Sequence, residues 1–248
     1  MPLLEASEVT VRFGGVVAVD DASLAIEEGR VAALIGPNGA GKTTLFNVMS
    51  GLQKPTSGRV EFDGEDITGA SPQKRARRGL ARTFQRLEVF GSLTVRENIR
   101  VAAEIHRTWN RKAGDPRATA DAVIERIGIG EFADLSADSI PTGIARLTEL
   151  GRALTIDPKL LLLDEPSSGL NDEETDQFGA LLQDLAREGR AVLMVEHDID
   201  LVMSVAEWID VLDFGKIIAS GPPEAVRADE AVQQAYLGAA TPADESAA

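Results

Sequence analysis

The stretch VAALIGPNGAGKTT, residues 31–44, decides the fold of this 248-residue chain. Its first five residues form an apolar run after the turn Glu27-Glu28-Gly29, which is typical of a buried strand. Residues 36–43 then fit the pattern G-x-x-x-x-G-K-[ST]. A helix is predicted over residues 43–49, with Gly51 placed to stop it. A strand, a glycine-rich loop and a helix in this order indicate an α/β fold with a mainly parallel sheet.

This glycine-rich loop has the chemistry of a phosphate-binding site. Glycines let backbone N–H groups turn inward around phosphate oxygens, where a Cβ atom would obstruct them. The N-terminus of the following helix adds partial positive charge, and Lys42 can reach the β- and γ-phosphates of a nucleotide. A chance glycine-rich turn is the alternative, but the flanking strand and helix favour a nucleoside triphosphate site. The predicted ATP-binding residues of this loop are Gly36, Pro37, Asn38, Gly39, Ala40, Gly41, Lys42, Thr43 and Thr44.

Buried strands recur further along the chain and alternate with helical patterns. The runs LLLLD at residues 160–164 and AVLMVE at residues 191–196 both read as buried strands. Helical periodicity covers residues 173–188 and 198–206. This alternation is the pattern of a parallel sheet covered by helices.

A helical insertion is predicted between two halves of this sheet, because residues 88–154 contain little that resembles a strand. Within it, Thr94 and Glu97 form a capping box for a helix that runs toward His106. Before it, Ser71 followed by Pro72 predicts another helix start. We therefore expect one domain over residues 1–237, with a core at about 1–87 and 155–237, a helical subdomain at about 88–154, and a disordered tail over 238–248.

Two adjacent carboxylates, Asp164 and Glu165, follow the apolar run LLLL. Ligands bind at the carboxyl ends of strands in open α/β sheets, so both lie where a nucleotide site is expected. Asp164 and the Thr43 hydroxyl suit positions near Mg²⁺, and Glu165 could act as general base on the attacking water. An acidic turn that caps the next helix is the alternative. His197 ends another strand, but a lone histidine there is most often a hydrogen-bonded structural residue.

Composition excludes several other classes of function. Hydrophobic residues make up 44% and charged residues 26% of the chain, as in an ordinary soluble globular protein. The net charge of −15 would repel a phosphate backbone, so we expect no nucleic-acid partner. The absence of cysteine excludes disulfides, thiolate metal sites and thiol catalysis. No signal peptide is visible and the apolar runs are too short to cross a bilayer, which predicts a cytoplasmic chain.

The charge is unevenly distributed along the chain. Residues 74–117 hold twelve Lys and Arg against four Asp and Glu, a net charge of +8, whereas the rest carries −23. Such a segment could dock on acidic protein surfaces or anionic lipid headgroups, at about 1 kcal/mol per suitably placed basic residue. Alternatively, parts of it, such as Lys74-Arg75 and Arg77-Arg78, form a solvated helix face.

In this order, the elements resemble the nucleotide-binding subunit of an ABC transporter over residues 3–237. The resemblance implies a P-loop NTPase core with a mainly parallel sheet, an N-terminal antiparallel β region and a helical subdomain. It also implies that Phe13 stacks on adenine and that Gln85 touches Mg²⁺ and the attacking water, while His197 contacts the γ-phosphate. The implied residues are Glu165, His197 and Gln85 for catalysis, Thr43, Gln85 and Asp164 for the metal, and Ser168, Gly169, Leu170 and Asn171 for the loop at the dimer interface.

Finer motifs narrow the family. RFGGVVAVDD, ARTFQ, GLNDEET, EHDIDLVM and FGKIIASGPPEAVRADEAVQQAYLG are similar to the ATPase subunits of bacterial branched-chain amino-acid importers. Related importers of urea and other amides share much of this pattern, which leaves the substrate open. The resemblance implies ATP and Mg²⁺ as cofactors. It implies a second ABC ATPase subunit (as a homodimer or heterodimer) and membrane permease subunits as partners, and a substrate-binding protein as an indirect one. It places the chain on the inner face of the cell membrane, with residues 74–117 toward the permease.

One stretch departs from the family pattern. The signature Leu-Ser-Gly-Gly-Gln corresponds here to Ile140-Pro141-Thr142-Gly143-Ile144, in which only Gly143 is retained. Pro141, expected in the first turn of a helix, has neither a hydroxyl nor an N–H, and Ile144 lacks a polar amide. The helix dipole and the Gly143 N–H remain to attract an anion. Because the family's signature acts on the nucleotide of the opposite subunit, we expect an asymmetric heterodimer with one impaired site. The alternative is that both sites work.

Two other functions stay open. An ATP-binding regulatory subunit with little turnover is favoured by the altered signature, but the intact Asp164, Glu165 and His197 oppose it. A soluble ABC protein of translation or DNA repair usually carries two ATPase domains or a long coiled insertion, and this chain has neither.

Overall fold

The computed structural model describes residues 2–237, so the predicted tail over 238–248 lies outside the described residues. The strands are β1 (Leu4–Phe13), β2 (Val16–Ile26), β3 (Val31–Ile35), β4 (Ser57–Phe62), β5 (Glu65–Asp66), β6 (Leu80–Arg82), β7 (Leu160–Asp164), β8 (Ala191–Val195), β9 (Trp208–Asp213) and β10 (Lys216–Gly221). The α-helices are α1 (Lys42–Ser50), α2 (Pro72–Arg77), α3 (Val95–Trp109), α4 (Pro116–Arg126), α5 (Thr142–Leu154), α6 (Asp172–Arg187), α7 (Ile199–Val205), α8 (Pro223–Ala228) and α9 (Glu230–Leu237). Two short 3₁₀ helices, η1 (Gly130–Phe132) and η2 (Ala137–Ser139), lie between α4 and α5.

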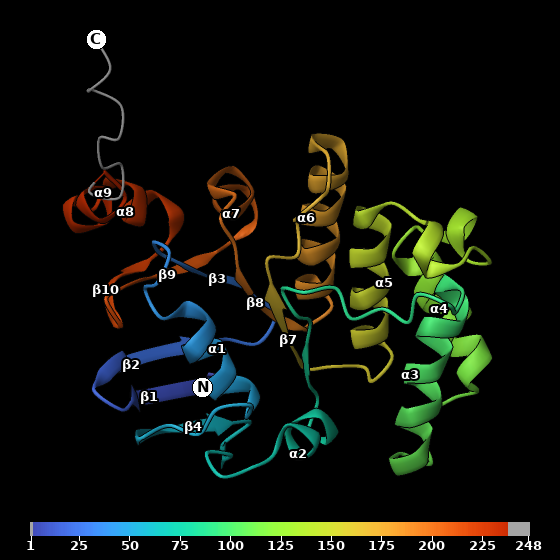
Figure 1. Cartoon of the computed structure of the whole chain (residues 1–248), viewed down its shortest axis with the longest axis horizontal. Coiled ribbons are helices and arrows are strands. Elements are labelled where there is room, and N and C mark those ends of the chain that lie inside the picture. Colours follow the sequence, from blue (N-terminus) through green and yellow to red (C-terminus); the bar gives the residue numbers. More distant parts are fainter. Residues whose placement is uncertain (1, 238–248) are drawn as a thin grey trace.

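Two sheets form the core (Figure 1). The larger sheet has the order β10-β9-β3-β8-β7-β6 and is parallel except at the β9–β10 edge. The smaller sheet, β2-β1-β4-β5, is antiparallel. The prediction of a mainly parallel α/β core with an antiparallel N-terminal region is therefore confirmed.

Helix α1 lies between the two sheets, because its apolar side chains pack against both. Leu45, Phe46 and Met49 are fully buried in one cluster with Leu4 of the antiparallel sheet and Leu34 of the parallel sheet. The opposite face of the parallel sheet packs on α6 and α7. Buried on both faces, β3, β7 and β8 are apolar except for Asp164 at the end of β7, as is typical of parallel strands.

Residues 88–154 form a group of helices beside the sheets, where α3, α4 and α5 stand together in Figure 1. They share a hydrophobic cluster of their own, which includes Val95, Ile124 and Ile144. The predicted capping box is present, because Thr94 Oγ1 accepts from Glu97 N–H at 3.1 Å and Glu97 Oε2 accepts from Thr94 N–H at 2.9 Å. The exact limits of the two subdomains stay a prediction. Within residues 2–237, no helix is both long enough and apolar enough to cross a bilayer.

The alternative that Lys74-Arg75 belongs to a solvated helix face is wrong for Arg75. Its side chain is 1% exposed and reaches inward from α2 toward the C-terminal end of α1. The guanidinium donates to the carbonyl oxygens of Val48, Met49, Ile67, Thr68 and Ala70, over distances of 2.6–3.2 Å. Burial lowers the pKa of Arg75 to about 10. A cation suits this place because unpaired carbonyls at a helix C-terminus carry negative partial charge.

Candidate active site

The glycine-rich loop, residues 36–43, leaves the end of β3 and runs directly into α1. Two of its glycines cannot be replaced without displacing backbone. Gly36 has φ +149°, and a Cβ on it would lie 1.9 Å from Leu212 O. Gly41, the N-cap of α1, has φ +106°, and its Cβ would lie 2.3 Å from Ala18 O. The pattern therefore needs glycine at both positions for steric reasons, and the free N–H groups of α1 open into the loop.

Lys42 is held inside this loop. Its Nζ donates to Gly36 O at 2.5 Å and to Pro37 O at 2.9 Å, and the residue is 6% exposed. Burial lowers the pKa of Lys42, while the nearby carboxylates of Glu165 and Asp164 oppose that shift. The ammonium is therefore placed by the loop carbonyls at the site where phosphate oxygens are expected.

A cavity of about 280 Å³ opens over the loop. It brings together residues from five separate parts of the sequence, including Gln85 after β6, Glu165 after β7 and His197 after β8. Its lining residues are Ala18, Asn38, Gly39, Ala40, Gly41, Lys42, Thr43, Thr44, Gln85, Glu165, Val195 and His197. The cavity thus lies at the carboxyl ends of parallel strands, as predicted.

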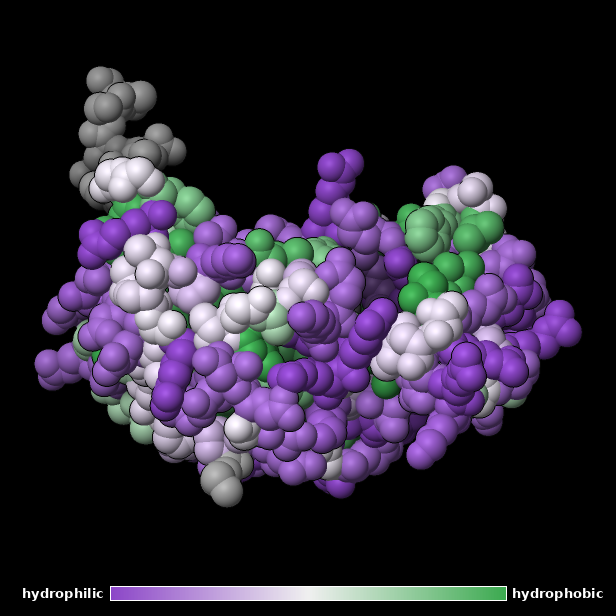
Figure 2. All heavy atoms as spheres, turned by 90° about the horizontal axis from the view of Figure 1, so that it is seen from below, coloured by the Kyte–Doolittle hydropathy of each residue, from purple (hydrophilic) through white to green (hydrophobic). Residues whose placement is uncertain are grey.

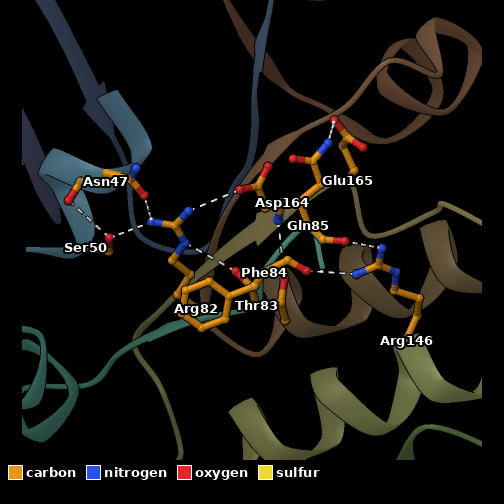
Figure 3. A network of polar contacts seen from close by, with 9 residues as sticks. All are labelled: Asn47, Ser50, Arg82, Thr83, Phe84, Gln85, Arg146, Asp164 and Glu165. Carbon is orange, nitrogen blue, oxygen red and sulfur yellow. Dashed lines mark hydrogen bonds and ion pairs between the residues drawn. The ribbon is translucent and has the colours of Figure 1, made fainter. Parts of the chain in front are cut away.

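Glu165 is the centre of the polar contacts in this cavity. Gln85 Nε2 donates to Glu165 Oε1 at 3.0 Å (Figure 3), and His197 Nε2 lies 3.0 Å from the same oxygen. Because a carboxylate only accepts, both neighbours donate, and His197 carries a proton on Nε2 in this arrangement. Glu165 itself has φ +48°, and its N–H donates to Val195 O at 2.8 Å. A non-glycine residue with positive φ is often found at a functional site, where surrounding contacts hold it.

Asp164 lies behind this cavity and pairs with Arg82, which we had counted only as part of the basic segment. Arg82 Nη2 is 3.1 Å from Asp164 Oδ2, and Nη1 donates to Asn47 Oδ1 and Ser50 Oγ of α1, both at 2.7 Å (Figure 3). Burial raises the pKa of Asp164, and Arg82 opposes that shift. A charged residue within a short strand, three positions before Gln85, was the signal that could have identified Arg82.

Glu196 is a second residue that our reading of the sequence missed. It is 4% exposed, and its Oε1 and Oε2 accept from the N–H groups of Ser167, at 2.8 Å, and His197, at 3.1 Å. This carboxylate joins the loop after β7 to the loop after β8, and so fixes His197 relative to Glu165. Its position at the end of the run AVLMVE was the available signal.

Phe13 and the loop 168–171 lie outside the cavity lining. Phe13 ends β1 and is 51% exposed. Asn171 caps α6, since its side chain accepts from Glu174 N–H at 2.9 Å. A Cβ on Gly169 would lie 2.8 Å from Thr142 Cγ2, so this loop packs on the start of α5.

The altered signature stretch forms the N-terminus of α5. Pro141 is the N-cap residue rather than a residue of the first turn, and it makes no side-chain cap. Gly143 is buried, with Leu170 Cδ2 only 2.6 Å from where its Cβ would be. Ile144 is 8% exposed and packs among the apolar side chains of the helical region. The residue that replaces the family's glutamine therefore contributes to a hydrophobic core.

Comparison with known proteins identifies the family. The sequence matches the ABC transporter family over residues 19–168, and the branched-chain amino acid ATP-binding cassette transporter family over residues 216–241. The chain belongs to the ABC transporter ATP-binding proteins. Family membership confirms the predicted fold and shows that this ABC protein is a nucleotide-binding ATPase.

Individual relatives of this ABC protein agree over nearly its whole length. It is 42% identical to the high-affinity branched-chain amino acid transport ATP-binding protein BraF of Pseudomonas aeruginosa, and 36% identical to the corresponding protein LivG of Escherichia coli K12. Each alignment covers 96% of this chain and 99% of the relative. A solved ATP-binding cassette of an ABC transporter in its ADP conformation superposes with a TM-score of 0.85 at 29% identity, covering 96% of this chain and 99% of that one.

Proposed function

We propose that this chain is the ATP-hydrolysing subunit of a bacterial importer for branched-chain or related amino acids, which it energises by ATP-driven dimer closure. The observation that carries the proposal is the convergence of Gln85 and His197 on one oxygen of Glu165, over the glycine-rich loop. The transport proteins BraF and LivG, similar over almost their full lengths, support the substrate class.

In this proposal, Glu165 is the general base that accepts a proton from the attacking water. A carboxylate with two donors on Oε1 keeps Oε2 free to accept from water. His197, which contacts Glu165, would also contact the γ-phosphate. Lys42 and the loop N–H groups would hold the β- and γ-phosphates. Phe13, which is exposed at the end of β1, would stack on the adenine ring.

The residues present also suit Mg²⁺, because hard oxygen donors surround the loop. Thr43 supplies a hydroxyl, Asp164 a carboxylate, and Gln85 a carbonyl oxygen, since its contact with Glu165 uses the Nε2 side of the amide. When bound, the ion would neutralise the charge on the phosphates. Arg82 would hold the Asp164 side chain in place.

The permease would dock in an apolar groove of about 340 Å³ beside these residues. Leu52 after α1, Ala76 of α2, Phe84 and Ala153 of α5 line it, and Leu52 and Phe84 are 51% and 39% exposed. Figure 2 shows the molecule from below, where hydrophilic residues dominate and hydrophobic atoms gather in small patches. We infer that a short amphipathic helix of the permease fills the groove, since an apolar groove accepts the apolar face of a helix. In this proposal, the chain lies at the inner face of the cell membrane and has a substrate-binding protein as an indirect partner.

A second candidate is an ATP-binding subunit with little turnover of its own, and the stretch 140–144 favours it. With Pro141 as N-cap and Ile144 buried, the start of α5 lacks the signature's serine and glutamine side chains for a phosphate of the opposite subunit, although the exposed Thr142 keeps a hydroxyl there. In a heterodimer, the site completed by this stretch would be slower by about 10²–10³-fold, the cost of losing one anion donor. The other site, with a partner's intact signature, would carry turnover.

ATPase assays of the assembled transporter test both candidates. With permease, partner ATPase and binding protein present, leucine, isoleucine or valine is expected to stimulate phosphate release, whereas urea and acetamide are not. Stimulation by urea alone would assign the chain to an amide importer. A homodimer as active as the complete transporter would contradict the asymmetric sites, and a complete transporter without turnover would favour the regulatory subunit.

A further inference from the structure

The segment that carries Gln85, residues 84–89, has no regular secondary structure. Before it, Thr83 N–H donates to Leu162 O, and after it, Leu93 N–H donates to Phe90 O. Between these two points, no backbone–backbone hydrogen bond joins residues 84–89 to any part of the described chain. The backbone N–H and C=O groups of such a segment must therefore be paired with side chains or with water.

Arg146 of α5 contacts this segment on both sides of Gln85. Its Nη1 donates to Phe84 O at 2.8 Å, and its Nη2 donates to Gln85 O (Figure 3). These carbonyls belong to the two peptide groups that flank the Gln85 Cα atom. Because peptide groups are planar, holding both restricts the φ and ψ of Gln85 and so directs its side chain.

Two further side chains of α5 hold the same segment at Glu88. Glu149 Oε1 accepts from Glu88 N–H at 2.6 Å, and Arg152 Nη1 donates to Glu88 O. With Arg146, they recur every three residues and so lie along one side of the helix. We name Arg146, Glu149 and Arg152 the α5 polar face.

Arg146 and Glu149 of the α5 polar face are largely buried and form an ion pair, and Arg152 is half-buried. The side chains of Arg146 and Glu149 are 10% and 5% exposed, and Arg146 Nη1 lies 3.3 Å from Glu149 Oε2. Hydrogen bonds from a charged donor are stronger than those from a neutral donor. The contacts are therefore suited to fix a segment that lacks backbone hydrogen bonds.

We propose that Arg146 is a positioning residue that holds Gln85 against Glu165, and that α5 thereby links the loop 168–171 to the hydrolytic site. The link to that loop is made about one turn before Arg146, at the N-terminal end of α5, where Thr142 and Gly143 pack on Gly169 and Leu170. The inference rests on the proposed function of Gln85 and Glu165 in hydrolysis. It adds a residue that acts through Gln85 and lies outside the cavity lining.

Hydrogen–deuterium exchange on the full chain tests the positioning directly. Arg146→Ala is expected to raise amide exchange within residues 85–90 by roughly tenfold, chiefly at Glu88 and Phe90, whose N–H groups donate to Glu149 and Asn98, because the loss of charged hydrogen bonds frees the segment. Exchange in α1 is expected to stay unchanged. Arg126→Ala is the matched control, because Arg126 is an arginine of the same helical region that pairs with Asp184 and Glu188. Unchanged exchange over residues 85–90 in Arg146→Ala overturns the proposal.

Steady-state kinetics of the assembled transporter test whether Arg146 acts through Gln85. Arg146→Ala is expected to lower kcat on the order of 10²-fold, with the KM for ATP within about twofold, because the misplaced group lies outside the phosphate loop. Arg146→Lys keeps the charge without the paired donors, so its kcat is expected to lie between those of the wild type and Arg146→Ala. In a Gln85→Ala background, Arg146→Ala is expected to have no further effect on kcat.

The outcomes separate this inference from the proposed function. Losses in kcat that multiply in the double variant show that Arg146 acts elsewhere and overturn the positioning role. If Gln85→Ala alone hydrolyses ATP at the wild-type rate, the proposed role of Gln85 fails. Amide exchange over residues 85–90 then still decides whether Arg146 holds the segment.

Discussion

Arg82 and Asp164 form a buried ion pair, Nη2 to Oδ2 3.1 Å, where the neighbouring strands β6 and β7 end beside α1. Their side chains are 7% and 4% exposed. Arg82 also contacts Asn47 and Ser50 of α1, so one guanidinium joins the phosphate-loop helix to the strand that leads into Glu165. The pair therefore connects two parts of the active site that are more than a hundred residues apart in the chain.

Replacing Arg82 by Ala is expected to destabilise the protein by about 3–5 kcal/mol, because a buried carboxylate at Asp164 is left without its partner. Urea unfolding followed by circular dichroism measures this. Arg59→Ala is the matched control, since Arg59 pairs with Glu61 on the surface at 3.3 Å and should cost about 1 kcal/mol or less. Equal losses in the two variants would contradict a structural role for the Arg82–Asp164 pair.

Glu165→Gln is expected to lower kcat by about 10²–10⁴-fold while ATP binding is retained, because the amide cannot accept the proton but keeps the shape of the side chain. Phosphate release measures the loss, and size-exclusion chromatography with ATP is expected to show an accumulated closed dimer. Glu173→Gln, at an exposed residue of α6, is the control with unchanged turnover. Normal hydrolysis by Glu165→Gln would show that Glu165 is not the base.

Leu52→Asp is expected to prevent assembly with the permease without unfolding the chain. The side chain is 51% exposed, so the isolated protein tolerates a charge, whereas a docked apolar helix does not. Co-purification of the permease with the tagged chain measures assembly. Leu135→Asp, 46% exposed and outside the groove, serves as the control. Equal recovery of the permease with both variants would place the docking surface elsewhere.

Arg75→Ala is expected to cost about 3–5 kcal/mol in the free energy of unfolding, because five carbonyl oxygens lose a buried charged donor. Arg77→Ala, exposed on the same helix, should change it by no more than about 0.5 kcal/mol. Denaturant titration of both variants checks this difference. A small effect at Arg75 would mean that water replaces the guanidinium.

Asp210→Asn is expected to stabilise the protein relative to the wild type, and this gain in the free energy of unfolding is expected to be larger at pH 8 than at pH 5. Asp210 is 2% exposed, and only its Oδ1 accepts a hydrogen bond, from Ser220 Oγ, among the residues that the structure describes. Burial raises the pKa of Asp210. Between the unfolded and the folded pKa, the native chain binds the extra proton, so wild-type stability falls as pH rises through the folded pKa.

The asparagine removes that pH dependence, and the expected gain at pH 8 is about 1–3 kcal/mol. Urea unfolding of both proteins at the two pH values measures it. Asp176→Asn, on the exposed side of α6, is the control and should shift stability by less than about 0.5 kcal/mol at either pH. A gain at pH 5 equal to that at pH 8 would contradict a raised pKa.

Local patterns were sufficient for three central strands and for several helices, whereas the antiparallel N-terminal region was expected only from the family resemblance. The strands at 31–35 and 160–164 and the capping box of Thr94 lie where the sequence predicts them, and helix ends differ by about one residue. These features depend on neighbours within a few positions, so hydrophobic periodicity and cap chemistry specify them. The glycine-rich loop is the clearest case, because its glycines, its lysine and its flanking elements are contiguous.

The burial of residues in the basic segment 74–117 could not be predicted from local patterns. The sequence determined that twelve basic residues are concentrated there, but not which of them face water. Arg75 and Arg82 are buried inside the molecule, while Arg77 and Arg111 are exposed. Only the tertiary structure separates them, because the partners of the buried cations lie on other elements, and charge along a chain carries no information about burial.

The sequence by itself determined a phosphate-binding α/β protein with two carboxylates at a strand end, because each of these is a contiguous motif with its own chemistry. Tertiary structure alone decided that Arg82 pairs with Asp164, that Glu196 joins two loops, and that Arg146 holds the backbone at Gln85. Each of these contacts spans 29 to 82 residues of chain. Hydrogen bonds form where folding brings donor and acceptor within about 3 Å, and only the packing of the elements determines that distance.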